Sequence, residues 1–253
     1  MGAQTVVADV ADELARRVVA GEYAPGDLMP SVRQVADEFE MNRATAQLVL
    51  GRLESYGFVD AHRGRGFTVR DVRRSGGVEV YRRLFRLSAP EIAVHMFRDV
   101  VETERTIVLD ALLAYTDSAA DGDLTALRKD IDELESLARA TEPDYRRLLV
   151  IEVGMVRRLL SELGHSMQRA VLNSIAELLF EVPAAVRAYF AVSADLHVLV
   201  WRALQAVWES GSGPSEAQLA LFEDLFAMYH EKVVATFEEF AHAGAPGRRA
   251  ASA

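Results

Sequence analysis

The chain has 253 residues, half of them hydrophobic, and it carries a formal net charge of −10 and no cysteine. This length suits two domains better than one, and the apolar half can bury a sizeable core. The lack of cysteine excludes disulfides and thiolate metal sites and fits a cytoplasmic location. No run of about eighteen uncharged apolar residues occurs, and residues 1–10 do not begin like a secretory signal, so we expect no membrane partner.

Residues 1–70 predict three short helices followed by two strands. Ser31, with Gln34 three residues later, forms a capping box at the start of the second helix. Asn42 is a good N-cap for the third helix, and Gly57 is placed where a glycine ends a helix. The expected elements are helices at 6–20, 31–39 and 42–56 and strands at 58–61 and 67–70, the strands joined by a glycine-rich turn.

This order of elements has a direct mechanical interpretation as a DNA-reading unit. A helix fits the major groove and its N-terminal residues meet the base edges, while the preceding helix braces it. Arginine and glutamine can pair with bases, asparagine and threonine can hold phosphates, and arginines on a hairpin tip can enter the minor groove. Residues 43–74 contain seven arginines and three acids, which gives this segment a local charge of about +4 on an acidic chain. The same residues also suit the solvated face of a small folded unit.

Three parts of residues 5–70 form a specific pattern: the run Gly21–Ser31, the pair Asn42-Arg43 and the run Gly64–Val69. This pattern resembles the N-terminal domain of the GntR family of bacterial transcription regulators. The resemblance implies a winged helix-turn-helix bound to double-stranded operator DNA, with contacts from Arg33, Asn42, Arg43, Thr45, Gln47, Arg63 and Gly64, to which the hairpin tip adds Arg65. Two positions depart from the family: Val32 replaces a usual glutamate and Gln47 a usual arginine, so the operator can differ at the base that Gln47 faces.

Beyond residue 78 the pattern changes to long helical periodicity. Leu148–Leu160 is apolar almost all round, which predicts a central helix. The expected helices lie near 79–86, 90–116, 123–140, 143–163, 166–190, 193–210 and 215–242. The predicted fold is therefore mainly α, with a winged helix-turn-helix at 1–72, a linker at 73–78, an all-helical domain at 79–243 and a disordered tail at 244–253.

The helical part resembles the effector domain of the FadR subfamily in the number and length of its helices. That resemblance implies a bundle that binds a small effector and forms a homodimer. Many relatives hold a divalent metal through an acid, a histidine four residues later and two further histidines; here Glu152 aligns with the acid, Val156 with the first histidine, and His197 and His230 with the others. One carboxylate and two imidazoles can still hold zinc. Alternatively, both histidines are satisfied in the core and Glu152 pairs with an arginine such as Arg105.

The apolar side chain of Val156 bears on the chemical class of the effector. Metal-bearing relatives are expected to bind carboxylates at the cation, whereas the fatty-acid-responsive branch lacks the first histidine and takes acyl-CoA. We therefore expect a homodimeric repressor that acyl-CoA or another lipid-like effector releases from DNA, and a metal-dependent carboxylate sensor is the alternative. The expected effector site comprises Arg105, Glu152, Val156, His197 and His230.

The motifs of common enzyme classes are missing from the sequence. There is no nucleophile elbow, no phosphate-binding glycine loop and no HExxH zinc motif, and the six histidines form no tight cluster. We therefore expect no enzymatic activity. A helical scaffold for protein contacts remains open as a third class.

Overall fold

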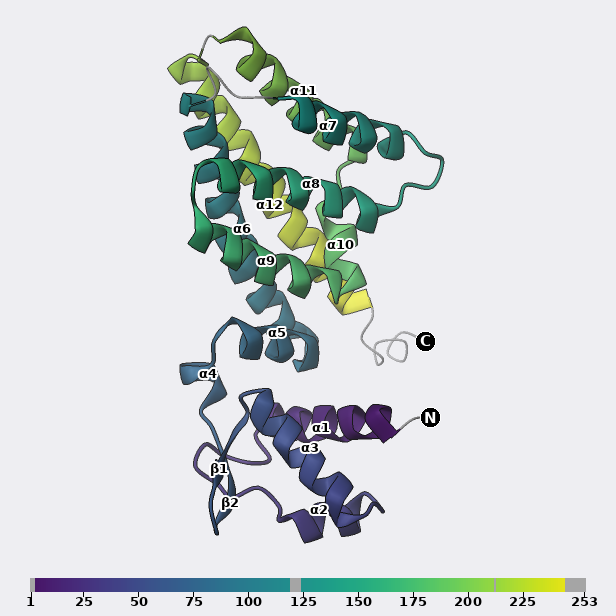
Figure 1. Cartoon of the computed structure of the whole chain (residues 1–253). Coiled ribbons are helices and arrows are strands. Elements are labelled where there is room, and N and C mark those ends of the chain that lie inside the picture. Colours follow the sequence, from purple (N-terminus) through teal and green to yellow (C-terminus); the bar gives the residue numbers. More distant parts are fainter. Residues whose placement is uncertain (1–2, 119–123, 212, 244–253) are drawn as a thin grey trace. The chain divides into compact units, whose positions relative to one another are not determined.

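A computed structural model describes residues 3–118, 124–211 and 213–243, with side chains from residue 6 onward. The chain divides into two compact units, Met1–Ala93 and Val94–Ala253 (Figure 1). The described residues are mostly helical with one small antiparallel hairpin, which confirms the predicted fold class. The tail expected to be disordered, at 244–253, lies outside the described residues.

Three helices build most of the N-terminal unit: α1 (Ala3–Ala20), α2 (Val32–Glu38) and α3 (Arg43–Ser55). The capping box at Ser31 forms as predicted, with the Ser31 side chain accepting from the Gln34 backbone N–H and the Gln34 side chain accepting from that of Ser31. Both α1 and α2 pack on α3. The apolar faces predicted from the sequence meet there, and Leu14, Leu50 and Leu53 are fully buried.

The two strands are β1 (Val59–His62) and β2 (Gly66–Val69), paired antiparallel in the register Val59↔Val69 to His62↔Gly66. Each differs by one residue from its predicted position, because the turn comprises only residues 63–65. Gly64 and Gly66 both have positive φ angles, of 77° and 96°, which lets the chain reverse over this short distance. An isolated bridge from Leu28 to Thr68 ties the segment before α2 to the hairpin.

The segment expected to be a linker, at 73–78, is mostly helical. It holds most of the short helix α4 (Val72–Ser75) and leads directly into α5 (Val78–Leu87). Helix α5, which we expected to open the C-terminal domain, instead packs on α1 and belongs to the first unit. The Arg83 guanidinium lies 3.4 Å from the centre of the Tyr56 ring, and Arg86 pairs with Asp12 at 2.7 Å.

The C-terminal unit is built from helices whose positions follow the predicted ones closely. They are α6 (Pro90–Ser118, which begins in the first unit), α7 (Thr125–Ala138), α8 (Tyr145–Glu162), α9 (Ser166–Phe180), α10 (Pro183–Tyr189), α11 (Ala194–Ser210) and α12 (Glu216–Ala243). The single helix predicted at 166–190 is wrong, because the chain breaks it into α9 and α10. Pro183 has no backbone N–H, and it keeps Val182 in an extended conformation.

Helix α8 packs against α7, α9 and α10, in keeping with its apolar sequence. Helix α7 lies along α11 (Figure 1), and Arg202 on α11 binds Asp132 on α7 at 2.6 Å. Phe97 of α6 stacks on Phe237 of α12, with ring centres 4.0 Å apart. No single helix among the described residues is long and apolar enough to span a membrane, although α10 and α11, bent by 58°, pass that test as a pair.

Candidate functional sites

The exposed start of α3 carries the polar residues predicted to read DNA. The Asn42 Oδ1 accepts from the Thr45 backbone N–H at 2.8 Å and from the Thr45 hydroxyl at 3.1 Å. Asn42 is therefore the N-cap of the helix, as predicted, and this role also orients Thr45. The prediction that Asn42 and Thr45 contact phosphates stays a prediction, and the cap adds a structural role for both residues.

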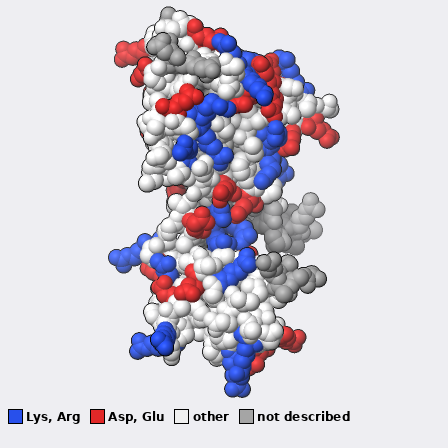
Figure 2. Space-filling view, viewed as in Figure 1, with Lys and Arg blue, Asp and Glu red and all other residues white. Residues whose placement is uncertain are grey.

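Arg43 and Gln47 are both exposed and lie four residues apart, so they share one face of α3. Arg33 is exposed on α2 and forms a loose pair with Asp37 at 3.7 Å. Arginine side chains protrude at the end of the N-terminal unit where α2 and the hairpin lie (Figure 2). Charged, extended groups at this end can reach the phosphates and bases of a groove.

The hairpin tip adds two arginines, because Arg63 and Arg65 are exposed on either side of Gly64. The tip is held by a hydrogen bond from the Arg65 backbone N–H to the His62 carbonyl at 3.0 Å. Behind it, the His62 ring and the Thr68 hydroxyl are hydrogen-bonded at 2.6 Å across the two strands. The wing therefore presents its two cations on a well-braced turn.

A second candidate site is a cavity of about 250 Å³ inside the C-terminal unit. Residues of α6, α8, α9, α10, α11 and α12 line it, and twelve of the nineteen lining side chains are purely apolar. Val156, predicted to belong to the effector site, lies in this wall. Large apolar side chains from facing helices complete it, including Leu112, Leu149, Phe222 and Phe226. A cavity with such walls and few polar groups suits a mainly apolar small molecule.

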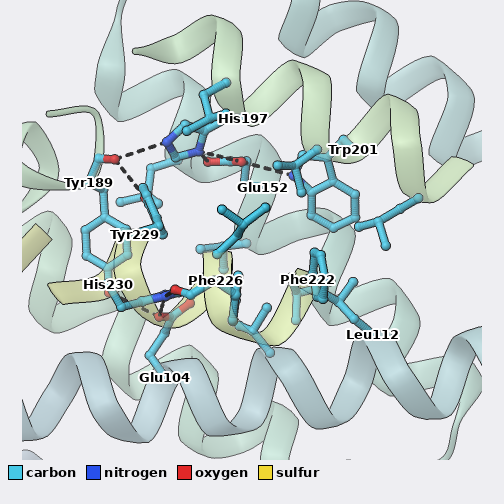
Figure 3. Close-up of a pocket in the computed structure, with 18 of the residues that line it drawn as sticks. Glu104, Leu112, Glu152, Tyr189, His197, Trp201, Phe222, Phe226, Tyr229 and His230 are labelled. Atoms are coloured by element: carbon cyan, nitrogen blue, oxygen red, sulfur yellow. Dashed lines mark hydrogen bonds and ion pairs between the residues drawn. The ribbon is translucent and has the colours of Figure 1, made fainter. Parts of the chain in front are cut away.

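Glu152 and His197, two of the residues expected in the effector site, meet in the cavity. The His197 Nδ1 lies 2.9 and 3.0 Å from the two carboxylate oxygens of Glu152, and its Nε2 lies 3.1 Å from the Tyr189 carbonyl (Figure 3). Both ring nitrogens thus face acceptors, as in a protonated imidazole. Burial opposes the ring's charge, but the charge and hydrogen bond of Glu152 outweigh it, so the pKa of His197 is raised. The Trp201 indole N–H also donates to Glu152, at 3.0 Å.

His230 belongs to a second pair, with Glu104. The His230 Nε2 lies 3.1 Å from the Glu104 carboxylate, and its Nδ1 lies 2.7 Å from the Phe226 carbonyl (Figure 3). The Tyr189 hydroxyl donates to the same Glu104 oxygen at 3.3 Å. Burial, together with the charge of Glu104, raises the pKa of Tyr189 well above its ordinary value, so the hydroxyl keeps its proton.

The three residues aligned with metal ligands do not form one ligand set. Among the described residues, no group of three or more acids and histidines is arranged to hold a metal ion. Both nitrogens of His197 and of His230 face oxygen atoms of the protein, so no ring nitrogen is turned toward a shared cation site. The donor set therefore does not fit zinc.

Arg105 does not pair with Glu152, which binds His197 and Trp201 instead. Arg105 lines a separate and more polar hollow between α6 and α12, next to Arg98 and Glu102. Glu104, which the sequence reasoning missed, takes a central place in the cavity. Its sequence signal was weak, because Glu104 is one of several acids in the amphipathic helix α6 and is separated by 126 positions from the histidine it binds.

The N-terminal unit has the parts of a winged helix-turn-helix: a bracing helix, a second helix with an exposed polar start, and a β-hairpin with cationic tip. Residues 7–69 match the family model described as bacterial regulatory proteins, gntR family. This domain is therefore a winged helix-turn-helix of the GntR type, which confirms the prediction made from its motif.

Two curated relatives match part of the chain. The HTH-type transcriptional regulator Mce2R of Mycobacterium tuberculosis is 31% identical over 99 residues, which are 39% of this chain and 41% of the relative. The uncharacterized HTH-type transcriptional regulator YhcF of Bacillus subtilis is 39% identical over 57 residues, 22% of this chain and 47% of the relative. The match thus spans less than half of the length of each. Both names are those of transcriptional regulators, in agreement with the prediction that the chain is not an enzyme.

Among solved structures, Lar, which controls the expression of the Listeria monocytogenes agr system, superimposes with a TM-score of 0.48 at 14% identity. The superposition covers 96% of this chain and 95% of Lar. Streptococcus agalactiae GntR superimposes with a TM-score of 0.37 at 15% identity, over 94% of this chain and all of the other.

Proposed function

We propose that this protein is a cytoplasmic, ligand-responsive transcription regulator of the FadR subfamily, which represses its target genes as a homodimer on a two-fold operator. The observation that carries the proposal is the exposed face of Arg43 and Gln47 on α3, in a domain that matches the GntR family, beside the cationic wing. Each protomer would place α3 in the major groove of one half-site, with Arg63 and Arg65 on the flanking backbone or minor groove.

The cavity in the C-terminal unit is the proposed effector site. Its apolar wall supports an acyl or other lipid-like group, in line with Val156 at the position of a usual metal ligand. An effector releases the protein from DNA only if it binds the two states of the dimer with different affinities, and a coupling of a few kcal/mol suffices. Because the two acid–histidine pairs do not fit a metal, carboxylate sensing through a bound cation has less support.

The test is a fluorescence anisotropy titration of the full chain against the DNA upstream of its own gene. We expect saturable binding at least about a hundredfold tighter than to a scrambled duplex of equal length, with two chains per operator. Affinity for both DNAs should fall with rising salt, since phosphate contacts release counterions. Equal affinity for the operator and the scrambled duplex would contradict the proposal.

A further inference from the structure

The side-chain hydrogen-bond donors that line the cavity are engaged by the protein, whereas its carboxylates keep acceptor capacity. Its lining includes five residues with side-chain N–H or O–H donors: Tyr189, His197, Trp201, Tyr229 and His230. Every one of these donors already faces an acceptor of the protein. The Tyr229 hydroxyl donates to the Tyr189 carbonyl at 2.7 Å, and the other donors are engaged as described above. Among the described lining residues, no donor is left for a ligand.

Acceptor capacity, by contrast, remains on the two carboxylates. A carboxylate has about four lone-pair sites. On Glu104, the described residues direct two donors to a single oxygen, from His230 and Tyr189. On Glu152, one carboxylate oxygen accepts hydrogen bonds from the Trp201 indole N–H and from His197. The other oxygen accepts only from His197. The polar part of the cavity can therefore accept hydrogen bonds from a ligand but cannot donate them.

The ionisable groups of the cavity are paired with one another in the same way. Each carboxylate has its own histidine partner, and no lysine or arginine is among the described residues that line the cavity. A carboxylate ligand would bring a negative charge next to Glu104 and Glu152 and would find no free donor, which is costly in an apolar site. An ammonium ligand would lose its hydration in a cavity whose wall is mainly apolar, where each carboxylate already accepts hydrogen bonds from the protein.

We infer that this cavity takes a neutral, mainly apolar molecule with a hydroxyl or N–H donor, and that it discriminates against free carboxylates. Since a cavity of about 150 Å³ accepts benzene, one of about 250 Å³ takes roughly ten non-hydrogen atoms. The inference rests on the proposed effector site and names its ligand class. It narrows a lipid-like effector to an uncharged head group, such as an alcohol or an amide.

The test compares three probes of matched chain length, octan-1-ol, octanoate and octylamine, by isothermal titration calorimetry with the full-length protein. We expect octan-1-ol to bind at least about tenfold more tightly than either charged probe, a difference of about 1.4 kcal/mol. Octanoate or octylamine binding as tightly as the alcohol would overturn the inference. So would the absence of binding by octan-1-ol.

A pair of variants ties the preference to the cavity. Glu104→Gln removes one negative charge and supplies an amide N–H₂ donor, so the preference for octan-1-ol over octanoate should fall at least about tenfold. The exposed Glu142→Gln makes the same change away from the cavity and should leave the preference unaltered. An unaltered preference in Glu104→Gln, checked for native circular dichroism, would overturn the inference.

A parallel titration against operator DNA separates this inference from the proposed function. If octan-1-ol binds selectively but DNA affinity does not change, the ligand class holds and the proposed release mechanism fails. If DNA affinity responds to octanoate but not to octan-1-ol, the release mechanism holds and the ligand class fails.

Discussion

At the scale of single residues, the proposed DNA contacts combine two kinds of side chain. Asn42 is engaged in capping α3, whereas Arg43 extends from an exposed position one residue later. A capping side chain acts mainly on stability, while an extended arginine at the helix start can form a bidentate pair with guanine. The two residues should therefore respond differently to substitution, and Arg43 is the sharper probe of DNA recognition.

Arg43→Ala should weaken operator binding by about tenfold to a hundredfold, because a bidentate base contact contributes about 1–3 kcal/mol. The helix should stay intact, since Arg43 precedes the buried face of α3. Lys129→Ala removes the same charge from an exposed position in the C-terminal unit and is expected to leave binding within about twofold. Anisotropy titrations of both variants check this, and equal losses would argue against a base contact.

The His197–Glu152 pair predicts a pH dependence of stability. Burial lowers the pKa of His197, but Glu152 outweighs this and raises the folded-state pKa above its ordinary value of about 6.5. The contribution of His197 to the free energy of unfolding is therefore complete below the unfolded-state pKa. It is lost as the pH rises through the folded-state pKa. Urea unfolding at about pH 6 and about pH 9 should show wild type losing more stability than His197→Gln. The exposed His242→Gln should behave like wild type, and identical pH profiles for all three would contradict the assignment.

At the scale of elements, α3 ends within one residue of the position predicted from its sequence. Gly57 follows the helix with a φ of 81°, and its backbone N–H donates to the Glu54 carbonyl at 2.8 Å. A left-handed conformation of this kind costs an L-residue about 1–2 kcal/mol. A Cβ at this position would also lie 2.8 Å from Val80 Cγ2 of α5, so the glycine both ends α3 and admits the next packed element.

Gly57→Ala should therefore destabilise the N-terminal unit by about 1–3 kcal/mol, the sum of backbone strain and the contact with Val80. Gly51→Ala is the matched control, because Gly51 lies within α3 and its Cβ would meet nothing within 4 Å. That change should stabilise the unit by up to about 1 kcal/mol through helix propensity. Urea denaturation measures both, and a neutral Gly57→Ala would show that the turn can relax.

At the scale of the whole molecule, the boundary between the units differs from the one that composition suggested. The run of arginine, serine and glycine at 73–77 reads as a linker, yet part of it is helix α4. The following helix, α5, buries Val80, Leu84 and Phe85 and joins the first unit. A DNA-binding domain that ended at residue 72 would lose this helix and expose the surface it covers.

A fragment of residues 1–89 should consequently unfold cooperatively, whereas a fragment of residues 1–72 should be less stable by several kcal/mol. Each buried apolar side chain of α5 contributes about 1.5–3 kcal/mol when fully buried. Circular dichroism with urea titration compares the two fragments. Leu84→Ala in the longer fragment should give an intermediate value, and equal stability of the two fragments would contradict the role assigned to α5.

The sequence by itself determined the local structure of this protein. Capping residues such as Ser31 and Asn42, glycines at positive φ and the spacing of apolar residues act within a few positions of the chain, so they predicted nearly all helices and the wing. The GntR-type motif was readable for the same reason, because its residues lie within one short segment.

Only the tertiary structure decided how distant polar groups are paired. Glu152 meets His197 across 45 positions and Glu104 meets His230 across 126. Several positions on one face of a helix could hold the partner of a distant polar group, and the spacing of residues along the sequence does not show which position is used. The family resemblance left open whether Glu152, His197 and His230 form one metal site or whether the histidines are satisfied in the core, whereas packing places them in two acid–histidine pairs whose donors face protein acceptors.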